Sequence, residues 1–218
     1  MINIKNHDKE KQKISFITDM PISLANAIRR SVLEIPTLAI DEVEIIKNDS
    51  ALFDEILAHR IGLIPIKTEK SSKEQKFKLK KQGEMVYSSD IKPSVDTPFK
   101  LPLTLLEGEQ EIELNASAKL GIGLEHIKHS PGLAFYKHNL DEDLLDFVEI
   151  EDDKITLNED ELKSKLSEEQ ISKLKKLKEI NEIIFTIESW GQLDVKDIFT
   201  KAIEALDKNL TELEKSVK

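Results

Sequence analysis

The C-terminal segment constrains the fold most, because its apolar side chains repeat with a helical period. Asp194 precedes the segment and predicts an N-cap. At 100° per residue, ten apolar side chains fall within an arc of about 160°: Val195, Ile198, Phe199, Ala202, Ile203, Ala205, Leu206, Leu210, Leu213 and Val217. A helix of about 23 residues is about 34 Å long, more than the core of so small a domain can cover. We expect part of the stripe to need another chain, although packing entirely within this chain remains an alternative.

The rest of the chain mixes strand and helix patterns, which predicts an α+β fold. Ile2 and Ile4 alternate before a polar turn, and Ile14 and Phe16 follow, as in a β-hairpin. A second helix is expected over 24–34, with Ser23 as its N-cap. The pattern then predicts a short helix over 51–62 and strands at 37–48, 84–90, 99–106, 111–121 and 182–191.

The helix over 24–34 has two distinct faces. Leu24, Ile28 and Val32 lie on an apolar face, and Arg29, Arg30 and Leu33 lie opposite. The chain has three arginines, the third being Arg60, against 29 lysines, so arginine is expected where a planar, bidentate donor is needed. An apolar residue between two arginines indicates a second contact face; the alternative is an ordinary exposed leucine.

Composition excludes several classes of protein. With no cysteine, the chain holds no disulfide, iron–sulfur cluster, thiolate zinc site or cysteine nucleophile. The net charge of −10 gives no broad attraction to nucleic acid. No apolar run is long enough for a membrane span and the charged start is no secretory signal, so we expect a cytoplasmic protein without membrane contact.

Motifs of catalysis are missing from the sequence. The chain has neither a phosphate-binding GxxxxGK[ST] loop nor a GxSxG nucleophile, and GIG at 121–123 lacks the context of a dinucleotide site. His126, His129 and His138 have partial metal spacing, which leaves a metalloenzyme as an alternative. The lysine-rich stretch 69–82 and the acidic stretch 141–180 are interpreted as solvated faces or loops. We expect no catalytic residue, cofactor or metal.

Four stretches, in order, resemble one family. They are LANAIRRSVLEIPTLAIDEVEIIKNDSALFDEILAHRIGLIPI at 24–66, VYSSDI at 86–91, LGIGLEHIKHSPGLAFYK at 120–137 and IESWGQLDVKDIFTKAIEAL at 187–206. The chain is similar to the D subunits of archaeal DNA-directed RNA polymerases, the counterparts of the bacterial alpha amino-terminal domain and the eukaryotic third-largest subunit. The resemblance covers most of the chain, apart from 69–82 and 141–180.

The resemblance implies a domain organisation. A discontinuous dimerisation domain, with helices packed on an antiparallel sheet, would comprise 1–46 and 181–218. A mostly β domain would be inserted at 47–180. Many D subunits carry an iron–sulfur domain where this chain has the acidic segment 141–180; without cysteine we predict no cluster there. A helix is expected around 168–179.

The resemblance also implies a function: a non-catalytic scaffold that pairs with the small L subunit and supports assembly of the large subunits. The implied L-subunit interface comprises Leu24, Ile28, Val32, Ile198, Phe199, Ala202, Leu206, Leu210 and Leu213. The face implied to meet the second-largest subunit comprises Arg29, Arg30, Leu33, His59 and Arg60. The small N and P subunits are further implied partners. The alternative in another class is a free-standing adaptor for protein–protein contacts with the same fold.

Overall fold

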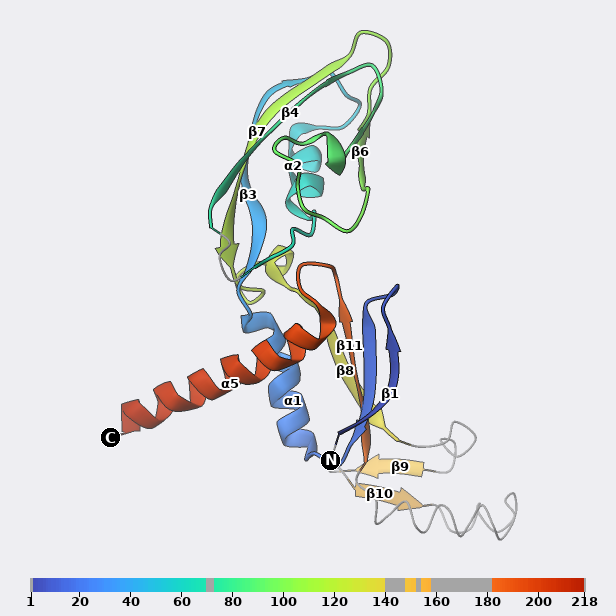
Figure 1. The fold of residues 1–218 in the computed structure, drawn as a ribbon, viewed down its shortest axis with the longest axis vertical. Helices are drawn as coiled ribbons and strands as arrows, with labels where there is room; N and C mark the ends of the chain where they lie inside the picture. Colours follow the sequence, from blue (N-terminus) through green and yellow to red (C-terminus); the bar gives the residue numbers. More distant parts are fainter. Residues whose placement is uncertain (1, 70–72, 140–147, 152–153, 158–181, 218) are drawn as a thin grey trace, which may run out of the picture.

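The computed structural model describes residues 2–69, 73–139, 148–151, 154–157 and 182–217. Two hydrophobic cores lie one above the other along the long axis of the molecule (Figure 1). The first core lies against an antiparallel sheet of order β1-β2-β11-β8. Its strands are β1 (Ile2–Asp8), β2 (Lys13–Thr18), β11 (Ile183–Ser189) and β8 (Gly132–His138). Two helices pack on this sheet, α1 (Ile22–Ser31) and α5 (Val195–Val217).

The second core lies against one face of a separate antiparallel sheet of order β3-β7-β4. Its strands are β3 (Thr37–Asn48), β7 (Glu111–Gly121) and β4 (Gln75–Gln82). Figure 1 shows α2 (Asp54–Gly62) between this sheet and the side carrying β6. The remaining strands form two short pairs, β5 (Met85–Tyr87) with β6 (Pro102–Leu105), and β9 (Val148–Glu151) with β10 (Lys154–Leu157). The predicted α+β class, with antiparallel sheets and few helices, is confirmed.

An aromatic cluster fills the first core. The ring of Phe185 stacks on that of Phe16, with centroids 5.5 Å apart, and Phe199 of α5 meets both rings edge to face. Tyr136 of β8 lies against the other side of Phe185. Aromatic pairs in such geometries add about 0.5–1.5 kcal/mol each beyond the burial of their area. The cluster therefore fixes the first half of α5 on the sheet.

Buried polar contacts join the two cores. Thr37 Oγ1 donates to the carbonyl oxygen of His129 at 2.6 Å, and His129 Nδ1 lies 2.9 Å from the carbonyl oxygen of Thr37. Burial lowers the pKa of His129 below its usual value. A Cβ on Gly121 would come within 2.6 Å of the imidazole Nε2, so this glycine makes room for the ring. GIG at 121–123 is thus a packing feature of the junction.

Three short 3₁₀ helices, η1 (Val32–Glu34), η2 (Ser88–Asp90) and η3 (Ile127–His129), complete the described elements.

The structure corrects several sequence-based expectations. Pro21, not Ser23, occupies the N-cap of α1, and α2 begins at Asp54 rather than at residue 51. The lysine-rich stretch contains β4, whose Phe77 and Leu79 are buried while the alternating lysines face solvent. β8 was not predicted. The helix expected around 168–179 lies outside the described residues.

The grouping into cores also differs from the predicted domain boundaries. The predicted limit at 46/47 falls within β3, whose Leu38 and Ile40 belong to the second core. The predicted insert, 47–180, includes β8, which pairs with β11 in the first sheet. The physical reason is that strand pairing between distant segments decides which core a residue joins, and no local pattern records it.

Candidate subunit interfaces

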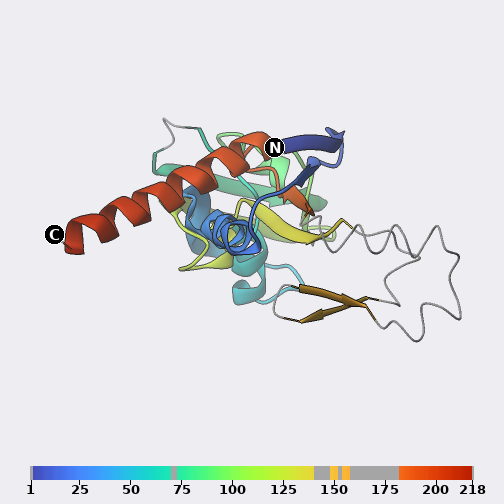
Figure 2. The same ribbon diagram turned by 90° about the horizontal axis from the view of Figure 1, so that it is seen from below.

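The long helix α5 has a buried half and a projecting half. Asp194 Oδ1 accepts a hydrogen bond from the backbone N–H of Lys196 at 2.9 Å, as expected of the predicted N-cap. Val195, Ile198 and Ala202 are then buried in the first core. Beyond residue 206 every described side chain of the helix is exposed, and Figure 2 shows this half extending well away from the body of the protein.

A regular apolar stripe follows the projecting half of α5. Ile203, Leu210, Leu213 and Val217 are 42%, 56%, 60% and 79% exposed, and Leu206 between them is half-buried. Their spacings of three and four residues alternate, which is the 3.5-residue period of a helix–helix seam. Polar side chains occupy the other faces; Lys208 and Glu212, for example, form an exposed ion pair at 3.8 Å. A seam of this kind is stable when another apolar surface covers it.

The structure divides the nine residues predicted to contact the L subunit. Leu24, Leu210 and Leu213 are exposed. Phe199 and Leu206 are half-buried and pack against the first core. The other four, contrary to the prediction, are at most 4% exposed and contribute to the chain's own core: Ile28, Val32, Ile198 and Ala202. Helical periodicity identifies an apolar face, but it does not tell which neighbour covers each turn.

The five residues predicted to contact the large subunit fall into two separate groups. Arg29, Arg30 and Leu33 lie at the end of α1 and in η1, whereas His59 and Arg60 lie on α2 of the other core. Each arginine is held differently, and within the described parts of the chain none forms an ion pair. Arg29 donates to Asn26 Oδ1 through Nε at 3.1 Å and Nη2 at 2.8 Å. Arg60 Nη2 donates to the carbonyl oxygen of Pro102 at 2.8 Å, and Arg30 is exposed.

An apolar groove of about 500 Å³ lies between the two cores. We call it the intercore groove. Segments next to both cores contribute to its lining: Leu33, Leu133 and Trp190 from η1, β8 and the loop after β11, and Leu63, Pro65, Phe99 and Leu101 from the loops that follow α2 and precede β6, with Ile127 of η3. Of the predicted contact residues, only Leu33 lines it. No local sequence pattern predicts the groove, because its sides come from five distant segments; Trp190, the single tryptophan, is the one signal of it in the sequence.

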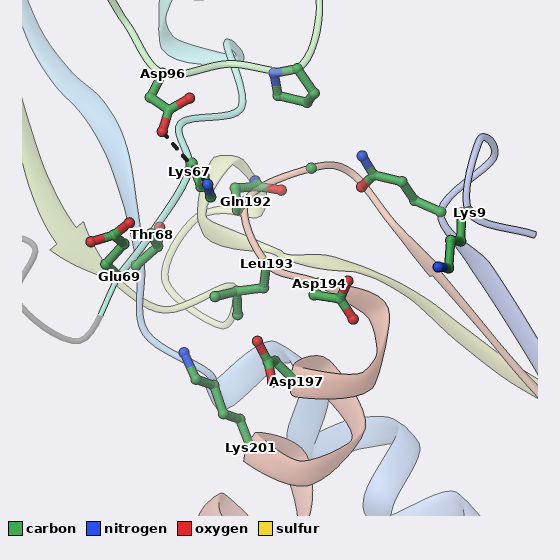
Figure 3. Close-up of a pocket in the computed structure, with 13 residues that line it drawn as sticks. Lys9, Lys67, Thr68, Glu69, Asp96, Gln192, Leu193, Asp194, Asp197 and Lys201 are labelled. Atoms are coloured by element: carbon green, nitrogen blue, oxygen red, sulfur yellow. Dashed lines mark ion pairs between the residues drawn. The ribbon is translucent and has the colours of Figure 1, made fainter.

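A second cavity, of about 580 Å³, is strongly polar (Figure 3). Lys9, Lys67 and Lys201 face it together with Asp96 and Asp197, and Lys67 pairs with Asp96 at 4.0 Å. Side chains of both signs line this cavity, so it does not favour an anion or a cation.

The histidines do not form a metal site in the described residues, which contain no group of three or more potential ligands. His126 is exposed, and its Nδ1 accepts from the backbone N–H of Lys128 at 3.1 Å. His129 is buried on Thr37, and His138 lies at the far end of β8. The alternative of a histidine metalloenzyme therefore gains no support from the geometry.

In the described residues, moreover, no helix is long and apolar enough to cross a membrane.

The fold combines two cores, a sheet covered by helices and a projecting helix with an exposed apolar seam. This combination is typical of a protein that pairs with another chain. The chain belongs to the family of RNA polymerase Rpb3/Rpb11 dimerisation domains, whose family model matches residues 16–210. It is similar over 99% of both chains to DNA-directed RNA polymerase subunit Rpo3 of Thermococcus kodakarensis, at 33% identity.

Two further relatives have the same description. The Rpo3 subunit of Methanocaldococcus jannaschii is 43% identical over 157 residues, which cover 68% of this chain and 82% of the relative. That of Methanosphaera stadtmanae is 34% identical over 94% of both chains. These matches confirm the family that the four sequence stretches predicted.

Proposed function

We propose that this chain is a non-catalytic assembly subunit of an archaeal DNA-directed RNA polymerase and that it pairs with the small L subunit. The observation that carries the proposal is the exposed seam on the projecting half of α5. Family membership supports it, since the matched family is a dimerisation domain. Leu24 on α1 is exposed and lies outside the chain's own core, so it is available to a partner as well.

The seam suits one long apolar partner surface better than a small ligand. Small-molecule sites are concave and enclose most of their ligand, whereas this seam is a convex helix face. In the proposed assembly four buried residues hold α1 and α5 on the first core and do not contact the partner: Ile28, Val32, Ile198 and Ala202. Direct contacts with the L subunit then fall on Leu24, Ile203, Leu206, Leu210 and Leu213.

Further partners belong to the same proposal. The arginine-bearing end of α1 is proposed to meet the second-largest subunit, with His59 and Arg60 on α2 as a separate contact, and the small N and P subunits dock elsewhere. We propose no catalytic residue and no direct contact with nucleic acid, in keeping with the net charge of −10. The alternative is a free-standing adaptor that uses the same seam.

Co-expression with the L subunit of the same genome tests the proposal, with size-exclusion chromatography and light scattering as the measurement. We expect a 1:1 complex, and aggregation of this chain when it is expressed alone, because the seam is then uncovered. A stable monomer or homodimer that ignores the L subunit would contradict the proposal and favour the adaptor.

A further inference from the structure

Three exposed lysines gather on the outer face of the second sheet, at its β4 edge. Lys76 and Lys78 alternate with the buried Phe77 and Leu79, so both lysines point away from the second core and from α2 (Figure 1). Lys78 and Lys92 form a backbone bridge in which each N–H donates to the other's carbonyl oxygen, at 2.6 and 2.7 Å. Residues directly opposite in an antiparallel pair share one face of the sheet, so Lys92 joins the other two. We call Lys76, Lys78 and Lys92 the β4 basic edge.

Elsewhere on this sheet the lysines are paired with carboxylates. Lys80 Nζ lies 2.6 Å from a carboxylate oxygen of Glu113, and Lys119 Nζ lies 2.6 Å from one of Asp41. Within the described parts of the chain, the β4 basic edge forms no ion pair, and Glu74, which precedes β4, forms none with it. The positive charge of the basic edge is therefore left for another molecule.

The neighbouring strands supply no countercharge to the basic edge. On β7, Ser117 lies opposite Lys76 and Asn115 lies opposite Lys78. On its other side Lys78 faces Lys92, and like charges directly opposite each other destabilise a sheet. The packing of the second core does not require this arrangement, because all three side chains are exposed. A bound anionic partner would relieve the repulsion.

We propose that the β4 basic edge binds an extended acidic segment of another polypeptide. Alternate residues of a strand lie about 6.8 Å apart, which sets the spacing of Lys76 and Lys78. An extended segment with a carboxylate at every second residue has the same repeat. It would place one carboxylate beside Lys76 and the next between Lys78 and Lys92. Complementary charge of this kind speeds the encounter of two chains and selects the partner.

The rest of the sheet face favours an acidic polypeptide over a nucleic acid. Glu42 and Glu44 are exposed on β3, opposite Ser117 and Asn115, and they would repel a long polyanion lying across the sheet. A short segment that follows β4 avoids them. Single-stranded nucleic acid is usually held by bases stacked on aromatic rings, whereas the one aromatic residue of β4, Phe77, is buried.

This inference goes beyond the proposed pairing with the L subunit. The exposed seam lies on α5, and the lining of the intercore groove includes no residue of β4. The basic edge is thus a third surface of the described chain, and its partner is distinct in chemistry from the apolar partner of the seam.

The test measures the binding of two fluorescein-labelled peptides to the full chain paired with the L subunit. In one peptide four glutamates alternate with four threonines; in the other the four glutamates are adjacent. Only the alternating peptide, when extended, presents all its carboxylates on one face. By fluorescence anisotropy we expect it to bind at least about threefold more tightly, as one or two additional exposed ion pairs would provide, and to weaken as salt screens the charges.

Substitution of the basic edge should remove this binding selectively. Lys76→Gln, Lys78→Gln and Lys92→Gln combined should weaken binding of the alternating peptide about tenfold, because each exposed ion pair contributes up to about fivefold. The control variant makes the same change in net charge and should alter affinity by less than about twofold. It replaces with glutamine three exposed lysines of β1 and the turn that follows: Lys5, Lys9 and Lys11. Normal pairing of both variants with the L subunit shows that they are folded.

Several results would overturn the proposal. Equal losses in the two triple variants would show that binding follows net charge rather than the basic edge. Equal binding of the two peptides, or no binding of either, would contradict the extended acidic segment. Tighter binding of a single-stranded oligonucleotide of the same charge would assign the basic edge to nucleic acid instead. Failure to pair with the L subunit would contradict the proposed function, and the same titrations on the full chain alone would then decide the basic edge.

Discussion

Replacing Leu210 and Leu213 by serine should weaken pairing with the L subunit without unfolding the chain. In the isolated chain these side chains are 56% and 60% exposed, so most of their apolar surface is free for a partner. Full burial of a leucine is worth about 1.5–3 kcal/mol, so the exposed fractions together represent about 1.7–3.5 kcal/mol. At 1.4 kcal/mol per tenfold, the dissociation constant should rise about 20- to 300-fold.

The assay is a titration of the two subunits by calorimetry or by fluorescence anisotropy of labelled L subunit. A matched control replaces Lys208 and Glu212 by serine, because that pair lies on the same exposed part of α5 but away from the seam. It introduces the same number of serines into the helix and should change affinity by less than about fivefold, since exposed ion pairs contribute about 0–1 kcal/mol. Equal effects of the two double substitutions would refute the argument that the seam, rather than the helix as such, forms the interface.

Three further predictions concern stability. Phe185→Ala should lower the free energy of unfolding by about 3–5 kcal/mol in urea denaturation, whereas Phe53→Ala, at a residue 74% exposed, should change it by less than about 0.5 kcal/mol. Hydrogen bonds from two lysines lower the pKa of Asp41 from 3.8 to about 2. The stabilisation of the folded chain by this carboxylate is therefore complete above about pH 4 and is lost as the pH falls through 2. Asp41→Asn should flatten the acid side of a plot of urea midpoint against pH, and an unchanged plot would contradict the assignment. Gly121→Ala should cost about 1–3 kcal/mol, because the new methyl group meets the ring of His129, and an unaltered melting temperature would argue against this packing.

Local patterns predicted the elements that carry a strong period. The strand β3 and the strand β7 were predicted with the bounds that the structure shows, because apolar and polar residues alternate along them. The seam of α5 was visible for the same reason. β4 was missed because its lysines dominate the composition, although Phe77 and Leu79 alternate between them and supply the missing signal.

The candidate interfaces show where such patterns stop. Ile198 and Leu210 occupy the same apolar arc of α5, yet the first is buried in the chain's own core and the second is 56% exposed. The resemblance implied one contact face for Arg30 and Arg60, and the structure places them on helices of different cores. Residue type and spacing describe a surface, but they do not identify the neighbour that covers it.

The sequence by itself determined the family, the α+β class and the presence of an apolar seam too long for one small domain. These follow from side-chain periodicity and from motifs that are contiguous in the chain. Only the tertiary structure decided that β8 returns to the first sheet, that four predicted contact residues are internal and that a groove opens between the cores. Each of these depends on pairing or packing between residues far apart in the chain, which local spacing does not encode.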